Sequence, residues 1–328
     1  CLYEAELVYL FIGACCMPSI EVPESMKLLP EETMGVMRRL EWLARKRMQG
    51  TLTGKHTSPD KGFSVEFAEH REYTPGDDPR NLDWRVMAKS DRNVIKQYIE
   101  ETNLRVTVAV DISGSMAFRG EEAALVDGEA MSKFAYARYL AAALSYLFIK
   151  QGDAAGLVTF DSRVRSYLRA GSRPSHLRRI VETLHQSEPG EETKVADVLH
   201  EVAERVHKRG LVILISDLFD EPQDIIESLH HFDFRQHELV LLHVLADEEL
   251  TFPFKAFQRF RDLEGVEPML RIDPQAVRAA YLEKVRDFVK SMETASGKLQ
   301  ADYVPVNTKT PLRDTLVRYL GRRMHAKR

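Results

Sequence analysis

The sequence predicts an α/β protein with a doubly wound, mostly parallel sheet and a smaller N-terminal helix-plus-β element. The main observation is that short, continuous apolar runs alternate with segments of helical pattern from residue 104 onward. Strands that are apolar throughout are typical of a parallel sheet covered by helices on both faces. The second observation is the composition of the 328 residues, 44% hydrophobic and 29% charged, which is that of an ordinary globular protein with one large core or two modest ones.

The first part of the chain carries weaker patterns. Residues 1–29 show no clear element. Residues 30–103 begin with a predicted helix at 30–49, which has acids in its first turn, bases in its last and Gly50 as its stop. The alternation of residues 63–67 predicts a strand, as does the segment Asn93 to Glu101.

Residues 104–328 form the predicted α/β domain. The expected strands are Leu104–Val110, Ala155–Phe160, Val164–Leu168, Leu211–Ser216, Glu238–Leu245 and Tyr303–Val306. The expected helices are Phe134–Gln151, one opening at Pro174, one from about Lys194 to Lys208, Pro222–Phe234, Pro274–Glu293 and one from Pro311. In such sheets ligands bind at the carboxyl ends of the strands.

Charge and cysteine content exclude several classes of function. The 46 Lys and Arg against 50 Asp and Glu give a net charge of -4, which argues against nucleic acid as a partner. Three cysteines without a zinc-binding pattern indicate a reducing cytoplasm. The apolar runs at residues 7–17, 140–149 and 239–246 are too short to cross a bilayer, so we expect no membrane span.

Oxygen-bearing side chains follow the predicted strands. Asp111, Ser113 and Ser115 stand in one short loop after the first strand of the α/β domain, Thr193 precedes a helix, and Asp217 directly follows an apolar strand. Small oxygen ligands with one or two acids suit a hard divalent cation, Mg²⁺ or Mn²⁺. The sequence therefore predicts a metal site at this edge of the sheet.

This ordered set resembles the metal-ion-dependent adhesion site of von Willebrand factor A domains. The resemblance implies that the hydroxyls of Ser113, Ser115 and Thr193 bind Mg²⁺, that of Thr193 directly or through water. It implies that Asp111 and Asp217 act through water. It also implies that the sixth coordination position stays open for a carboxylate from a partner protein.

A second motif, the run from Glu69 to Arg85, reads EHREYTPGDDPRNLDWR. It is similar to the hallmark of the bacterial domain-of-unknown-function family fifty-eight, in which it precedes a von Willebrand factor A-like domain. The resemblance implies a MoxR-type AAA+ ATPase, and its client protein, as partners. Many members of that family carry transmembrane helices near the N-terminus, whereas no such segment is expected here.

Simpler interpretations stand beside the metal site. An Asp-x-Ser-x-Ser loop is also typical of a capped turn, since these side chains bond their own backbone. Thr193 is also a candidate helix N-cap. Asp220, three residues beyond Asp217, is the alternative acidic ligand.

The hallmark of residues 69–85 has a structural interpretation as well. Arg71, Arg80 and Asp83 are expected to form ion pairs that lock the turn Pro75–Pro79, and Trp84 is expected to anchor packing.

Known enzyme templates are absent from the sequence. It contains no G-x-S-x-G elbow, no H-E-x-x-H helix and no G-x-x-x-x-G-K-[ST] loop. We therefore expect a non-enzymatic, metal-dependent protein-binding module, an adaptor or co-chaperone of the ATPase. The alternatives are a Mg²⁺-dependent hydrolase, in which Asp111 and Asp217 activate a water, and a surface adhesion protein.

Overall fold

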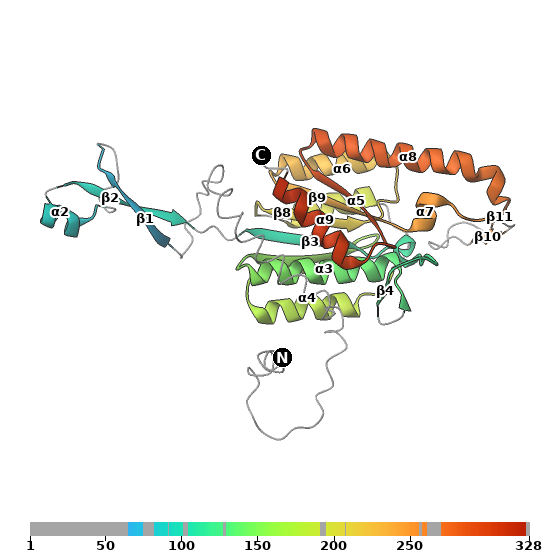
Figure 1. The fold of residues 1–328 in the computed structure, drawn as a ribbon, viewed down its shortest axis with the longest axis horizontal. Coiled ribbons are helices and arrows are strands. Elements are labelled where there is room, and N and C mark those ends of the chain that lie inside the picture. The colour runs from blue at the N-terminus through green and yellow to red at the C-terminus, as the bar shows by residue number, and fades with distance from the viewer. Residues whose placement is uncertain are drawn as a thin grey trace, which may run out of the picture.

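The computed structural model describes residues 65–74, 82–90, 92–100, 104–126, 129–190, 195–206, 208–255, 258–260 and 270–325 (Figure 1). The predicted segment 1–29 and the predicted helix 30–49 lie outside the described residues. So do the turn Pro75–Pro79 and the candidate ligand Thr193.

A six-stranded sheet forms the centre of the α/β domain. Its strands are β3 (Arg105–Asp111), β6 (Ala154–Phe160), β7 (Val164–Gly171), β8 (Leu211–Ser216), β9 (Glu238–Leu245) and β12 (Asp302–Asn307). The order across the sheet is β12-β9-β8-β3-β6-β7. All neighbours are parallel except β7, which pairs antiparallel with β6 at one edge. The predicted fold class, a mostly parallel α/β sheet, is confirmed.

Helices cover both faces of this sheet, as Figure 1 shows. One face is covered by α3 (Lys133–Lys150), α4 (Pro174–Gln186) and α9 (Leu312–His325); the other by α5 (Val195–Arg205), α6 (Pro222–Phe234) and α8 (Pro274–Lys298). Successive strand residues point to opposite faces, so Val108 packs in the first core and Ala109 in the second. Because both faces are buried, the four central strands β3, β6, β8 and β9 are mostly apolar, which is why the sequence predicted them well.

Helix α3 lies in the middle of the first face and is buried along most of its length. Its N-cap is Ser132, whose hydroxyl accepts a hydrogen bond from the backbone N–H of Ala135 at 3.1 Å. The many alanines let the helix approach the sheet closely. Lys133, the first helical residue, is also buried, and it becomes important at the site below.

The sequence patterns did not predict the seven-residue helix α2 (Trp84–Ser90), nor six still shorter elements. The six are η4 (Gly114–Ala117), β4 (Leu125–Val126), β5 (Glu129–Ala130), α7 (Asp247–Thr251), β10 (Gln258–Phe260) and β11 (Leu270–Ile272). None is long enough to show a hydrophobic period. None of the helices in the described ranges is both long and apolar enough to cross a membrane.

The described part of the N-terminal element is a hairpin of β1 (Val65–Glu72) and β2 (Val94–Glu100), which pair antiparallel, with helix α2 (Trp84–Ser90) between them. Asp83 caps α2, since its Oδ1 accepts a hydrogen bond from the backbone N–H of Arg85 at 3.0 Å. The expectation that Trp84 anchors packing is wrong. Its side chain is 62% exposed, because α2 has no buried residue.

Candidate metal centre

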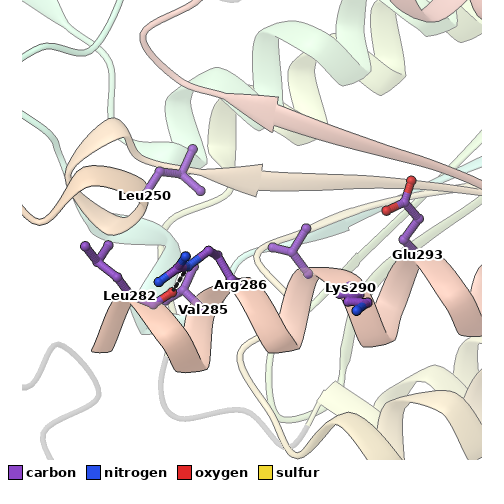
Figure 2. A pocket seen from close by; sticks show the side chains of 7 residues that line it. Leu250, Leu282, Val285, Arg286, Lys290 and Glu293 are labelled. Atoms are coloured by element: carbon purple, nitrogen blue, oxygen red, sulfur yellow. Dashed lines mark hydrogen bonds between the residues drawn. The ribbon is translucent and has the colours of Figure 1, made fainter. Parts of the chain in front are cut away.

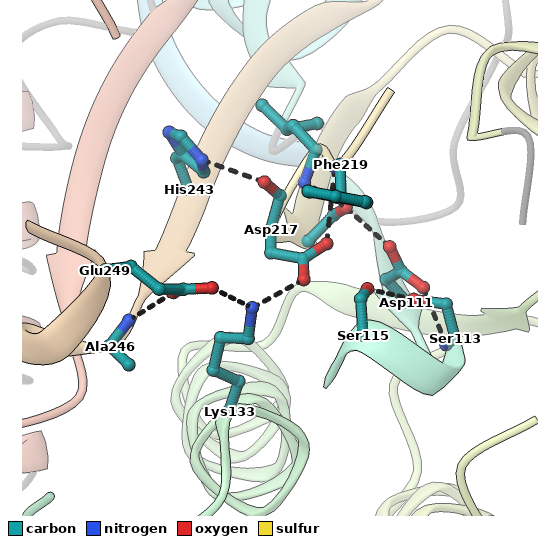
Figure 3. Close-up of polar contacts among 11 residues, drawn as sticks. Asp111, Ser113, Ser115, Lys133, Asp217, Phe219, His243, Ala246 and Glu249 are labelled. Carbon is teal, nitrogen blue, oxygen red and sulfur yellow. Dashed lines mark hydrogen bonds and ion pairs between the residues drawn. The ribbon is translucent and has the colours of Figure 1, made fainter. Parts of the chain in front are cut away.

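The two predicted acidic residues lie together at the carboxyl edge of the sheet. Asp111 is the last residue of β3, and Asp217 directly follows β8. These strands are hydrogen-bonded neighbours, with Val110 opposite Ile215. The parallel pairing therefore brings residues 106 positions apart to the same place, and Figure 3 shows both carboxylates there.

The Asp-x-Ser-x-Ser loop is tightly held. Asp111 has no exposed surface; its Oδ1 accepts from the backbone N–H of Ser113 at 2.8 Å and its Oδ2 accepts from the hydroxyl of Ser216 at 2.6 Å. The hydroxyls of Ser113 and Ser115 lie 3.0 Å apart. The capped turn is thus present, and it also brings two hydroxyl oxygens close to each other beside a buried carboxylate.

The loop that leads to Thr193 is attached to this site at Gly190. The backbone N–H of Gly190 donates to the carbonyl oxygen of Ile112, inside the Asp-x-Ser-x-Ser loop, at 2.6 Å. A Cβ at this position would overlap the carboxylate of Asp161, so only glycine fits here without a shift. Thr193 itself is outside the described residues, and its role as a ligand stays a prediction.

Asp217 and the alternative ligand Asp220 have different partners: Asp217 accepts from the ammonium of Lys133 at 2.7 Å and from the backbone N–H of Phe219 at 3.4 Å. Asp220 is engaged by backbone donors: its Oδ2 accepts from Ala196 N–H at 3.2 Å and its Oδ1 from Glu221 N–H at 2.8 Å. The carboxylate of Asp220 therefore binds backbone N–H groups at the start of α5 and just before α6. The carboxylate of Asp217 faces the Asp-x-Ser-x-Ser loop instead (Figure 3).

Two further charged residues at this site were missed by the sequence reasoning. The ammonium of Lys133, whose side chain is 2% exposed, donates to Asp217 Oδ2 at 2.7 Å and to Glu249 Oε1 at 2.8 Å. Glu249 lies on α7, just beyond β9, and its Oε2 also accepts from the backbone N–H of Ala246 at 2.7 Å. A signal for Glu249 was available, since it also follows the carboxyl end of a predicted strand. Lys133 gave only the weak signal of a lone base at the start of an apolar helix.

Burial and neighbouring charge shift the ionisation of these groups. Burial, and then the negative charge of Asp217, raise the pKa of Asp111 to about 7. Burial alone would lower the pKa of Lys133, but the charges of Asp217 and Glu249 outweigh it and raise that pKa above its usual value. Lys133 is therefore a permanent positive charge inside the site.

His243 supports the site from behind. Its Nε2 lies 2.9 Å from the carbonyl oxygen of Asp217 and its Nδ1 lies 2.6 Å from the hydroxyl of Tyr303. Because a carbonyl can only accept, Nε2 carries the proton and Nδ1 accepts from Tyr303. Burial lowers the pKa of His243 to about 4, so the ring is neutral and holds the backbone of Asp217 in place.

The residues present fit a hard divalent cation. The ammonium of Lys133 bonds two carboxylates, those of Asp217 and Glu249, and the third carboxylate, Asp111, lies near Asp217, so negative charge remains uncompensated when all are ionised. Two hydroxyl oxygens converge beside them. Among the described residues no group of three His, Cys, Asp or Glu side chains is arranged to hold a metal directly. A cation here would depend on hydroxyls and on water held by the acids, which is the arrangement that the resemblance implied.

An exposed aromatic side chain stands beside this edge. Leu218 is buried and has a left-handed backbone conformation with φ of 51°, and the next residue, Phe219, is 67% exposed. The Leu218 N–H donates to Ser216 Oγ at 2.8 Å, so the turn is held by the same serine that bonds Asp111. The loop after β8 thus buries one side chain and presents the next to solvent.

A separate groove of about 460 Å³ lies between α7 and α8 (Figure 2). It is lined by Leu250, Leu282, Val285, Arg286, Val289, Lys290 and Glu293. None of the five predicted site residues lines it, although Leu250 directly follows Glu249.

The six-stranded sheet, with β7 as its antiparallel edge strand and the Asp-x-Ser-x-Ser loop at the end of central strand β3, defines a mixed, mostly parallel α/β domain. The chain belongs to the family described as Protein of unknown function DUF58, whose model matches residues 69–290.

Similar proteins include the uncharacterized protein Rv1480 of Mycobacterium tuberculosis, 26% identical over 299 residues, which cover 87% of this chain and 91% of that protein. Among solved structures, the conserved hypothetical protein BatB of Bacteroides thetaiotaomicron is 15% identical with a TM-score of 0.44, covering 68% of this chain and all of that one. The SpRpn10 VWA domain is 9% identical with a TM-score of 0.37, covering 66% of this chain and 95% of that one.

Proposed function

We propose that this chain is a non-enzymatic, metal-dependent protein-binding module that takes a partner's carboxylate through Mg²⁺ or Mn²⁺. One observation carries the proposal: the hydroxyls of Ser113 and Ser115 lie 3.0 Å apart, above the buried carboxylate of Asp111 and next to Asp217. Hydroxyl oxygens with nearby acids are ligands that suit hard divalent cations.

Each residue has a distinct task in this proposal. Ser113, Ser115 and Thr193 supply hydroxyl oxygens, and Asp111 and Asp217 accept hydrogen bonds from water around the ion. Bound Mg²⁺ supplies a positive charge that attracts an Asp or Glu side chain of the partner. The buried hydrogen bonds of Asp111 keep the loop in shape before any ligand arrives.

The surroundings favour protein binding over hydrolysis. Phe219, 67% exposed, provides an aromatic contact beside the site, and aromatic side chains are enriched among the residues that dominate protein interfaces. A hydrolase would need an accessible base. Both ring nitrogens of His243 are already engaged, one by the hydroxyl of Tyr303 and one by the carbonyl oxygen of Asp217.

For the partner we propose a MoxR-type AAA+ ATPase in the cytoplasm, with this chain as its adaptor or co-chaperone toward a client protein. This choice follows from what the resemblance of residues 69–85 to that family implies. A pull-down in Mg²⁺ and nucleotide that recovers no such ATPase would count against the adaptor role, while leaving the metal site untouched.

The metal site is tested by thermal unfolding with increasing Mg²⁺ or Mn²⁺. A ligand that binds only the folded state at 100 times its dissociation constant stabilises it by about 2.7 kcal/mol. We expect such a shift in the wild type and none in the double variant Ser113→Ala, Ser115→Ala. Ser291→Ala, on the distant helix α8, is the matched control. An equal shift in the double variant would place the ion elsewhere and refute the proposed site.

A further inference from the structure

We propose that Lys133 is a built-in cation that competes with the divalent ion for Asp217, and that Glu249 moderates this competition by holding the same ammonium from the other side. This inference rests on the proposed function, because it concerns the affinity of the same site. It adds two residues that determine how strongly, and under which conditions, the site is loaded.

Lys133 stands at a helix N-terminus and in a buried place, both of which are unfavourable for a positive charge. It is the first residue of the 18-residue helix α3, directly after the N-cap Ser132. The N-terminal end of a helix carries a partial positive charge, which disfavours a cation there. The side chain is also 2% exposed, and a buried charge is costly without partners. A buried lysine at this position therefore depends on the two carboxylates that bond its ammonium.

The contacts place the ammonium beside the metal site. It lies 2.7 Å from Asp217 Oδ2 and 2.8 Å from Glu249 Oε1. Figure 3 shows the carboxylate of Asp217 between Lys133 on one side and the loop of Ser113 and Ser115 on the other. One acidic side chain thus faces both the ammonium and the predicted place of the divalent ion.

A divalent ion at the two hydroxyls would share Asp217 with this ammonium. Two positive charges a few ångströms apart repel each other, and inside a protein the repulsion is only partly screened. Removing the charge of Lys133 should therefore tighten the binding of Mg²⁺ by about tenfold or more.

Glu249 has the opposite effect. Its carboxylate gives the ammonium a second partner and adds one negative charge close to the site. Without that charge, Lys133 would pair with Asp217 alone and neutralise it more fully. Removing the charge of Glu249 should therefore weaken the binding of Mg²⁺ several-fold. A buried ion network with a purely structural role would not give two opposite changes in affinity.

The experiment is calorimetric titration of Mg²⁺ into four proteins: wild type, Lys133→Gln, Glu249→Gln and Lys150→Gln. Lys150 is the exposed last residue of the same helix, so its variant controls for the loss of one positive charge. We expect tighter binding in Lys133→Gln, weaker binding in Glu249→Gln and unchanged binding in Lys150→Gln. The melting temperature without metal gives a second readout. Lys133→Gln leaves two carboxylates without their cation, so it should melt lower and regain more stability from Mg²⁺ than the wild type does.

The outcomes separate this inference from the proposed function. If the wild type binds Mg²⁺ and Lys133→Gln binds it no more tightly, the inference is overturned and the metal site stands. If only Lys133→Gln binds, the inference is supported in its strongest form. If neither protein binds, the metal site is refuted and the inference fails with it. Should Lys133→Gln not fold without metal, Glu249→Gln decides, because an affinity equal to that of the wild type contradicts the proposed competition.

Discussion

Replacing Asp111 with asparagine should make the metal-free protein more stable. In the folded chain this carboxylate has no exposed surface, accepts hydrogen bonds from neutral donors only, and lies near the negative charge of Asp217. Asparagine has the same shape. Its Oδ1 can still accept from the Ser113 N–H, and its amide can donate to the hydroxyl oxygen of Ser216.

The size of the effect follows from the pKa of Asp111. Folding raises this pKa from 3.8 to about 7, so at pH 7 the unfolded chain is almost fully ionised while the folded one resists ionisation. A difference of roughly 3 pH units corresponds to at most about 4 kcal/mol, at about 1.4 kcal/mol per unit. An amide hydrogen left without a partner reduces the gain by about 1–2 kcal/mol. At pH 7 we therefore expect the free energy of unfolding of Asp111→Asn to be about 2 kcal/mol higher than that of the wild type.

The sign of the pH dependence is a further part of this prediction. A raised acidic pKa destabilises the fold above pH 3.8, and the penalty disappears as the folded state takes up its proton between pH 7 and pH 4. The advantage of the variant should therefore shrink toward pH 4. Urea unfolding of both proteins in EDTA at pH 7, 6, 5 and 4 measures this difference in stability.

Asp161→Asn is the matched control, since Asp161 is equally buried and follows the neighbouring strand β6. Its Oδ2 accepts from Arg165 Nε at 2.6 Å, so this variant should lose about 1–3 kcal/mol. If Asp111→Asn were instead less stable than the wild type at pH 7, as is expected of Asp161→Asn, burial of the Asp111 carboxylate would not destabilise the fold and the reasoning would be refuted. A Mg²⁺-induced shift of full size in Asp111→Asn would refute the role of Asp111 at the metal site.

Two other predictions concern the partner and the support of Asp217. Phe219→Ala should weaken binding to the partner ATPase by about tenfold or more in a surface-binding assay while leaving the melting temperature nearly unchanged, because the side chain is 67% exposed beside the site. Phe234→Ala is its control: this residue is 88% exposed at the far end of α6, at the opposite edge of the sheet, and equal losses in both variants would exclude a docking role for Phe219. His243→Gln should have a lower free energy of unfolding than the wild type at pH 7, since the bonds to Asp217 and Tyr303 are changed. This difference in free energy should shrink by up to about 3 kcal/mol when the pH is lowered to 4. The reason is that the pKa of His243 is 6.5 in the unfolded chain and about 4 in the folded one, so the histidine of the wild type costs stability between these two pH values and glutamine does not. If urea unfolding gave the same difference in free energy at pH 7 and pH 4, the neutral, buried ring would be contradicted.

The large elements could be predicted because each carries its own periodic signal. Strands β8 and β9 and helix α6 have the bounds that the apolar runs and Pro222 indicated. The ends of α8 and α9 were less precise, since their exposed faces dilute the hydrophobic period. Elements of five residues or fewer, such as α7, carry no period at all, and the sequence patterns passed over them.

The candidate site was predicted in part for a similar reason. Asp111 and Asp217 stand at strand ends, and the rule that ligands bind there identified both. Lys133 was missed because it belongs to a helix start, where nothing in the local sequence shows which carboxylates the fold will bring to it. Trp84 was misjudged because a large aromatic side chain suggests a core, while its short helix packs none of its residues inward.

The sequence by itself determined the alternation of strands and helices, and hence the sheet class and the edge at which the acids gather. This follows because burial on both faces requires strands that are apolar at every position, a property that is local in the chain. Only the tertiary structure shows that Asp220 accepts from backbone N–H groups at the start of α5 and before α6, and that the ammonium of Lys133 joins Asp217 and Glu249. The two ion pairs of Lys133 join residues 84 and 116 positions apart, and electrostatic pairing depends on distance in space, which the strand order β9-β8-β3 sets.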